Sequence, residues 1–238
     1  MNNMWIKHFK AVTWKELIEG WRKIRLFIPI TIIGVVGLQY VPVKQIVTNT
    51  QLLSAQKGVL LGVFTMYFSI MIIPLIGNTL FSMSLYEEKL QYTIHTLLAS
   101  GISKTSIWSG KFIVAIVYSY ATVLISILAY FIFIKFYIGQ DLVLTSQTAI
   151  LTFIAMPITS IGILALVGWS YWAFKYPQIF SGIISMASIL GTWNIIMKFS
   201  TKYPLPIVTL LSLAIGIFFI VAVIFAVRYL PKERIISL

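Results

Sequence analysis

The chain has 238 residues, of which 59% are hydrophobic and only 10% are charged. A soluble domain carries about 25% charged residues, so this composition indicates a surface covered by lipid and excludes an ordinary soluble domain. Membrane topology and anionic lipid headgroups account for the net charge of +12, which needs no nucleic-acid partner. The absence of cysteine excludes disulfides and thiolate chemistry.

The first 25 residues predict an amphipathic helix at the membrane interface. Apolar residues, two tryptophans among them, recur there at steps of three and four, with charged residues between them. Thr13 and Glu16 have the spacing of a capping box, and Val12 and Leu17 have that of a hydrophobic staple. We therefore expect the helix to begin at Trp14.

Six windows without charged residues are long enough to cross a bilayer as helices, for which about 20 residues are needed. The first window follows 25 residues without a signal-peptide cleavage site, so we interpret it as a retained span. The sequence thus predicts an all-α polytopic membrane protein, with a single transmembrane domain over residues 1–238. The six predicted spans cover residues 26–43, 59–83, 112–134, 149–173, 178–197 and 207–228.

Basic residues predict the orientation of these spans. With six spans both termini share a side, and that side carries most of the 18 lysines and arginines. The positive-inside rule then places both termini and residues 84–111 in the cytoplasm, with the spans in the cell membrane.

Residues 84–111 interrupt the apolar sequence between spans two and three with charged residues. Apolar residues step there by four, four and three, which predicts one helix with a single apolar stripe. Glu87, Glu88 and His95 fall on its other faces, so we expect solvated carboxylates and a solvated histidine. The stripe consists of Tyr86, Leu90, Ile94 and Leu97.

Helix signals follow directly after this stripe. Gly101 suits a helix C-terminus, and Ser103 can cap a new helix with Ile102 and Ile107 as its hydrophobic staple. We expect the second helix to continue through Trp108 into span three.

The sequence EEKLQYTIHTLLASGIS resembles the signature of type-2 ATP-binding-cassette (ABC) export permeases. In that signature a glutamate is followed by Gly-Thr, two leucines, a proline, an aliphatic residue and a serine. Tyr92 replaces the usual glycine and Gly101 the usual proline. The matching positions are Glu88, Thr93, Leu97, Leu98, Ile102 and Ser103.

The resemblance implies that this loop is a coupling helix in a groove of a cytoplasmic ATPase subunit, with Glu87 and the six matching residues in the contact. It implies a dimer with a second permease copy or a paralogue, served by two ATPase subunits, usually in a bacterium. ATP and magnesium would bind to the ATPase, because this chain has no phosphate-binding loop, and we expect no catalytic residue, cofactor or metal site on it. The implied cargo is a membrane-active or antimicrobial peptide that leaves the cell.

The predicted cargo path is uncharged, because the six windows hold no ionisable acidic or basic residue of the kind that marks ion pathways. The alternative is that its polar residues only pack helices together. Pro74 and Pro157 predict kinks in spans two and four. The candidates for the path are Tyr67, Asn78, Tyr118, Thr122, Ser126 and Thr159.

Aromatic residues near the span ends predict interfacial belts. They are Trp169, Tyr171, Trp172 and Tyr176 at the cytoplasmic end of span four, with Tyr40, Trp193 and Tyr203 near the outer ends.

Two other functions stay open at this point. One is an ATPase-independent membrane channel or scaffold, and the other is the substrate-binding membrane subunit of a vitamin importer. A metal-dependent intramembrane enzyme is disfavoured, because the only two histidines, His8 and His95, lie in different segments.

Overall fold

The computed structural model describes residues 2–202, 205–231 and 235, with side chains for 6–191, 206–231 and 235. These residues form helices and no strand, as predicted. In chain order the helices are α1 (Asn2–Ile24), α2 (Phe27–Leu38), α3 (Tyr40–Thr48), α4 (Ser54–Val63), α5 (Met66–Phe81), α6 (Glu87–Leu90), α7 (Thr93–Ala99), α8 (Lys104–Phe133), α9 (Ser146–Ile150), α10 (Met156–Ala173), α11 (Pro177–Lys202) and α12 (Leu205–Tyr229).

Three π-helical turns continue these helices. They are η1 (Ser82–Tyr86), η2 (Ile134–Ile138) and η3 (Leu151–Ala155). The turn η3 lies immediately before Pro157, and π-helical turns and prolines are both common places for a helix to bend.

Five continuous helical segments of the described chain are long and apolar enough to cross a membrane, and each matches one predicted span. They are Phe27–Thr48, Ser54–Leu90, Lys104–Ile138, Ser146–Ala173 and Pro206–Tyr229. At the remaining predicted span, 178–197, the helix α11 is apolar over Pro177–Gly191, the part of it whose side chains the structure describes. The fold is therefore that of a multi-pass helical membrane protein.

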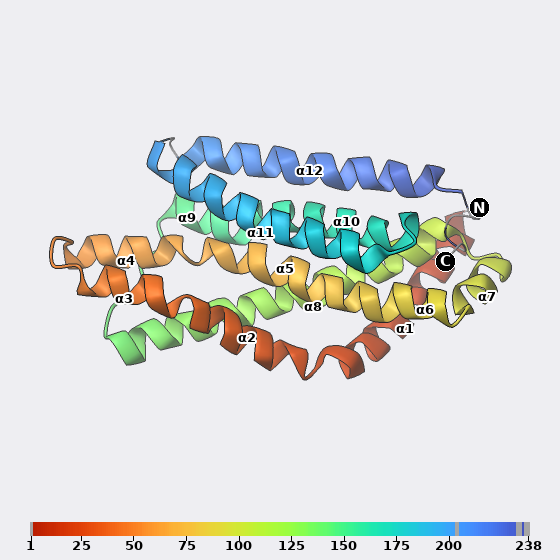
Figure 1. Ribbon diagram of the computed structural model, residues 1–238, viewed down its shortest axis with the longest axis horizontal. Helices are drawn as coiled ribbons and strands as arrows, with labels where there is room; N and C mark the ends of the chain where they lie inside the picture. The colour runs from red at the N-terminus through yellow and green to blue at the C-terminus, as the bar shows by residue number, and fades with distance from the viewer. Residues whose placement is uncertain (1, 203–204, 232–234, 236–238) are drawn as a thin grey trace.

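The spans lie side by side in one elongated body, with their axes close to its long axis (Figure 1). The helix α10 lies between α5, α11 and α12, and α5 also packs against α8. The core contains large apolar side chains of α5 and α10, such as Phe68, Ile72 and Leu164. Many apolar residues of α2 and α12 are exposed instead, as expected for helices whose outer faces contact lipid.

Glycines allow the closest approach between spans. A Cβ atom on Gly162 of α10 would lie 2.6 Å from the carbonyl oxygen of Gly216 of α12, and one on Gly216 would lie 2.6 Å from the Ile158 carbonyl oxygen. Transmembrane helices commonly use small residues in this way to bring their backbones together.

The two ends of the body differ. The helices α6 and α7, α1 and the C-terminal end of α12 lie at one end, called here the α1 end, and the loop between α3 and α4 lies at the other (Figure 1). Lys104, at the start of α8, donates a hydrogen bond to the Leu230 carbonyl just after α12. Both ends of the described chain are thus on the same side, as the six-span prediction requires.

The expectation that the first helix begins at Trp14 is wrong. The helix α1 begins at Asn2, because residues 2–13 contain no glycine or proline that would stop it. The Thr13 hydroxyl is not a cap, since it donates to the Phe9 carbonyl within the helix at 2.8 Å. The expected amphipathic pattern is present, with Trp14, Ile18 and Trp21 exposed.

The aromatic belt predicted at the end of span four is partly wrong. Tyr171 and Trp172 are buried between helices, whereas Tyr176 is exposed. Tyr40 is exposed near the other end, as predicted. Trp193 and Tyr203 lie outside the residues whose side chains are described.

Candidate functional site

The segment between α5 and α8 forms two short helices, so the prediction of one helix with one stripe is wrong. The chain breaks after α6 because Tyr92 has a φ of 58°. Among the described residues, Tyr92 is the only non-glycine residue with a positive φ. A left-handed residue ends an α-helix and costs roughly 1–2 kcal/mol when it is not glycine. The break turns Leu90 outward, where it is 49% exposed. The buried side chains of the segment are Leu85, Lys89, Ile94 and Leu98.

The transition into span three was predicted correctly. Gly101 has a positive φ of 80° and follows the end of α7. The Ser103 hydroxyl caps α8 by accepting a hydrogen bond from the Ser106 amide at 3.1 Å. Ile107 is fully buried, and Ile102 packs against the same core. The segment is therefore joined to the start of α8 by a capped turn whose apolar side chains pack into the core.

A buried ion-pair cluster lies beneath the segment. The Lys111 side chain of α8 is only 1% exposed, and its Nζ lies 2.5 Å from Glu16 Oε1 of α1 and 3.0 Å from Glu88 Oε1 of α6. Removing charges from water costs several kcal/mol per ion, which only close pairing offsets. The cluster therefore joins α1, α6 and α8 in one arrangement.

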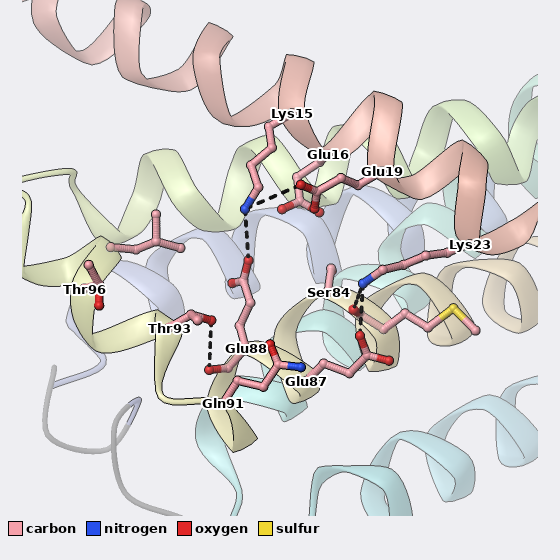
Figure 2. A pocket seen from close by; sticks show the side chains of 12 residues that line it. Lys15, Glu16, Glu19, Lys23, Ser84, Glu87, Glu88, Gln91, Thr93 and Thr96 are labelled. Carbon is pink, nitrogen blue, oxygen red and sulfur yellow. Dashed lines mark hydrogen bonds and ion pairs between the residues drawn. The ribbon is translucent and has the colours of Figure 1, made fainter.

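Figure 2 shows more exposed ion pairs, made by Lys15 and Lys23 of α1, near this cluster. Lys15 Nζ lies 3.9 Å from both Glu19 and Glu88, and Lys23 Nζ lies 3.0 Å from Glu87. Exposed pairs of this kind contribute about 0–1 kcal/mol each. Together they line a charged groove of about 360 Å³ between α1 and the α6–α7 segment.

Two lysines connect the segment to the ends of other spans. Lys89 is buried, and its Nζ lies 3.5 Å from the Tyr171 carbonyl near the C-terminus of α10. Lys104 bonds to the Leu230 carbonyl after α12. Cations are stabilised at helix C-termini, where carbonyl groups lack partners within the helix.

The predicted coupling residues have different exposures. The Glu87 side chain is 46% exposed, whereas that of Glu88 is only 13% exposed and pairs with Lys111, so the prediction of two solvated carboxylates holds for Glu87 alone. The Thr93 hydroxyl donates to the Glu88 carbonyl at 3.3 Å. Leu97 lines the charged groove and Leu98 is buried.

His95 is not on a solvated face, contrary to the prediction. It is half-buried, its ring lies 5.6 Å from that of Tyr92, and its Nε2 is buried without a protein hydrogen-bond partner. Among the described residues, no group of three or more histidine or acidic side chains is placed to bind a metal ion.

Four of the six predicted cargo-path residues bond through their hydroxyl groups within or between helices. On α8, Ser126 and Thr122 each donate to the carbonyl four residues earlier, and Tyr118 donates to the Leu17 carbonyl of α1. Thr159 of α10 donates to the Ser212 carbonyl of α12 at 2.8 Å. These four hydroxyl groups join helices or bond within them, as the packing alternative expects.

The other two candidates lie on α5. Tyr67 is buried in a small apolar cluster near Leu151 and Met156. Asn78 differs from the rest, because it lines a polar cavity together with Tyr171.

Lys111, Glu16 and Lys89 were missed as site residues. One signal was available in the sequence, since Glu16 is one of only six acidic residues in a chain with 18 basic ones. Because acidic residues are so few, one that lies in a segment rich in lysine is a candidate for a structural ion pair.

The fold and this cluster define a multi-pass helical membrane protein whose α1 end is fixed by buried ion pairs. Comparison of the chain with models of protein families, with curated proteins and with solved structures found no match in any of the three.

Proposed function

We propose that this chain is the membrane permease subunit of an ATP-driven exporter of the ABC type. In this proposal the α1 end faces the cytoplasm, and the α6–α7 segment contacts one of two ATPase subunits that serve a permease dimer. The ATPase subunits bind ATP and magnesium, and this chain supplies the path through the membrane.

The observation that carries the proposal is the connection of the α6–α7 segment to the spans. The segment continues directly from α5 through η1 and leads into α8 through Ser103, and Lys111 joins it to α1. A partner that pushes on the segment would therefore move α1, α5 and α8 together. Ligand-driven changes need such an element, because only differential contacts between two states shift an equilibrium.

The exposed face of the segment suits a protein partner. Leu90 and Tyr92 project from it, and the exposed Glu87 lies nearby. Exposed apolar side chains beside charged ones are typical of contact surfaces, in which a few residues contribute most of the binding free energy.

The proposed cargo is an amphipathic or hydrophobic molecule, such as a membrane-active peptide. The charge-free sequence of the spans supports this choice, because a strongly charged cargo would find no partner within them.

Replacing Leu90 with lysine tests the contact without touching the buried cluster. We expect stimulation of the partner ATPase by this chain to fall roughly tenfold, because a charge replaces a partly exposed apolar contact. The measurement is ATP turnover of the ATPase, encoded next to this chain if the proposal is right, with and without the permease in liposomes. Phe136→Lys is the matched control, since Phe136 is 82% exposed but follows α8 at the opposite end. Equal stimulation by both variants and by the wild type would favour a channel or scaffold.

A further inference from the structure

A polar cavity adjoins the charged groove at Met83, which lines both. It has a volume of about 260 Å³, and its lining comes from α2, α5, η1, α10 and α11. Its lining contains no acidic or basic residue, and most of its side chains carry a hydroxyl or an amide group. These polar residues are Asn78, Thr79, Ser82, Tyr171, Gln178 and Ser181.

A buried hydrogen-bond chain organises the cavity. The Tyr171 hydroxyl donates to Asn78 Oδ1 at 2.9 Å, and the Ser181 hydroxyl donates to the Tyr171 oxygen at 3.3 Å. Tyr171 and Ser181 are both buried, so these groups are fixed in place. Asn78 uses its oxygen in this chain, and its amide nitrogen is a donor of the kind that a ligand oxygen could accept.

Apolar surface continues from the cavity toward the middle of the membrane. Leu75 precedes Thr79 by one turn on the same face of α5 and is exposed. Ile30 of α2, one turn after the lining residue Phe27, is also exposed. Lys23 borders the cavity at the α1 end, where it donates to the carbonyl of the lining residue Met83 and pairs with Glu87. The surface is therefore polar near the α1 end and apolar deeper in the membrane.

This gradient matches the orientation of a lipid in the leaflet at the α1 end. Polar groups that face hydrocarbon are costly unless they are hydrogen-bonded, so a row of hydroxyl and amide groups at this position favours a polar ligand. The lining itself holds no acidic or basic residue, which favours an uncharged headgroup, since a buried charge needs a counter-charge.

We infer that this cavity binds an uncharged amphiphile from that leaflet, with a hydroxyl- or amide-bearing headgroup against Asn78 and Tyr171 and an acyl chain along Leu75. The inference goes beyond the proposed function, because it holds whether or not an ATPase drives the chain.

A photoactivatable monoacylglycerol, with a diazirine in its acyl chain, tests this inference on the full chain in nanodiscs. We expect labelling to saturate, to map to α5 and α11, and to be displaced by unlabelled monooleoylglycerol but not by oleate. Tyr171→Phe should raise the half-saturating concentration about two- to tenfold, which is the loss expected for one hydrogen bond.

Two further variants make the result decisive. Thr79→Phe fills the cavity from a half-exposed position, so it should abolish saturable labelling without disturbing the fold, even if Tyr171→Phe proves unstable. Tyr130→Phe, at a buried tyrosine of α8 whose hydroxyl lies 3.4 Å from the Leu61 carbonyl, should label like the wild type.

Labelling that never saturates, that Thr79→Phe leaves unchanged, or that oleate displaces equally well would overturn the inference. A Thr79→Cys cross-link between two chains in nanodiscs would overturn it in favour of a second copy on this surface.

Discussion

Replacing Lys111 with methionine is expected to lower the free energy of unfolding by about 3–5 kcal/mol. Methionine keeps most of the length of the side chain but removes its charge. Glu16 and Glu88, which lie 2.5 and 3.0 Å from Lys111 Nζ, would then lose their closest cation and keep only the more exposed Lys15, 3.9 Å from Glu88. The packing of α1 against α8 and α6 should loosen first. The measurement is equilibrium unfolding of the purified protein in mixed micelles.

Two comparisons separate this effect from a general loss of charge. Lys135→Met removes a lysine whose pair with Asp141 is long, at 4.0 Å, and exposed, so it should change the free energy by less than about 1 kcal/mol. Adding Glu16→Gln and Glu88→Gln to Lys111→Met should restore much of the loss, because no unpaired charge remains. If Lys111→Met lowered the free energy of unfolding no more than Lys135→Met does, the buried cluster would not be what holds α1 in place.

The second large effect is expected at the crossing of α10 and α12. Gly162→Leu should destabilise the protein by about 3 kcal/mol or more, because its Cβ would lie 2.6 Å from the backbone oxygen of Gly216, which no rotamer change relieves. We expect α12 to separate from α10, with a lower yield of monodisperse protein and a lower midpoint of thermal unfolding.

The control for this substitution is Gly182→Leu on α11. A Cβ at Gly182 meets no atom within 4 Å, and the residue is exposed. Leucine there should be neutral or slightly stabilising, because it favours a helix over glycine by roughly 0.5–1 kcal/mol. Equal losses from both variants would show that the α10–α12 contact is not a close one.

Local signals predicted the spans and the start of α8. The five long apolar segments appear in the sequence because a bilayer requires about 20 apolar residues for each crossing, and that requirement is local. The cap at Ser103 and the break at Gly101 could also be predicted from the sequence, because each depends on the chemistry of one residue.

The features that were missed depend on distant parts of the chain. Glu16 has the spacing of a capping box, but it pairs with Lys111, which is 95 residues away, and no local rule contains that contact. The tyrosine at position 92 does not itself indicate a helix break, because tyrosine rarely takes a left-handed conformation, and the glycine usual there in the resembled signature was the available signal. The stripe from Tyr86 to Leu97 therefore looked continuous although the chain turns within it. The partner that we propose for the α1 end is likewise not specified by any local pattern of residues.

A single cysteine at position 90 tests most directly whether the α1 end is a docking surface for an ATPase. The natural chain has no cysteine, so Leu90→Cys gives a single reactive thiol, and Phe136→Cys gives a more exposed one at the opposite end. The measurement is cross-linking of each variant to the ATPase encoded beside it, in native membranes with and without ATP. We predict a cross-link from position 90 whose yield changes with ATP, and none from position 136. Equal yields from the two positions, or no cross-link from position 90 while the chain still moves its cargo, would contradict the account.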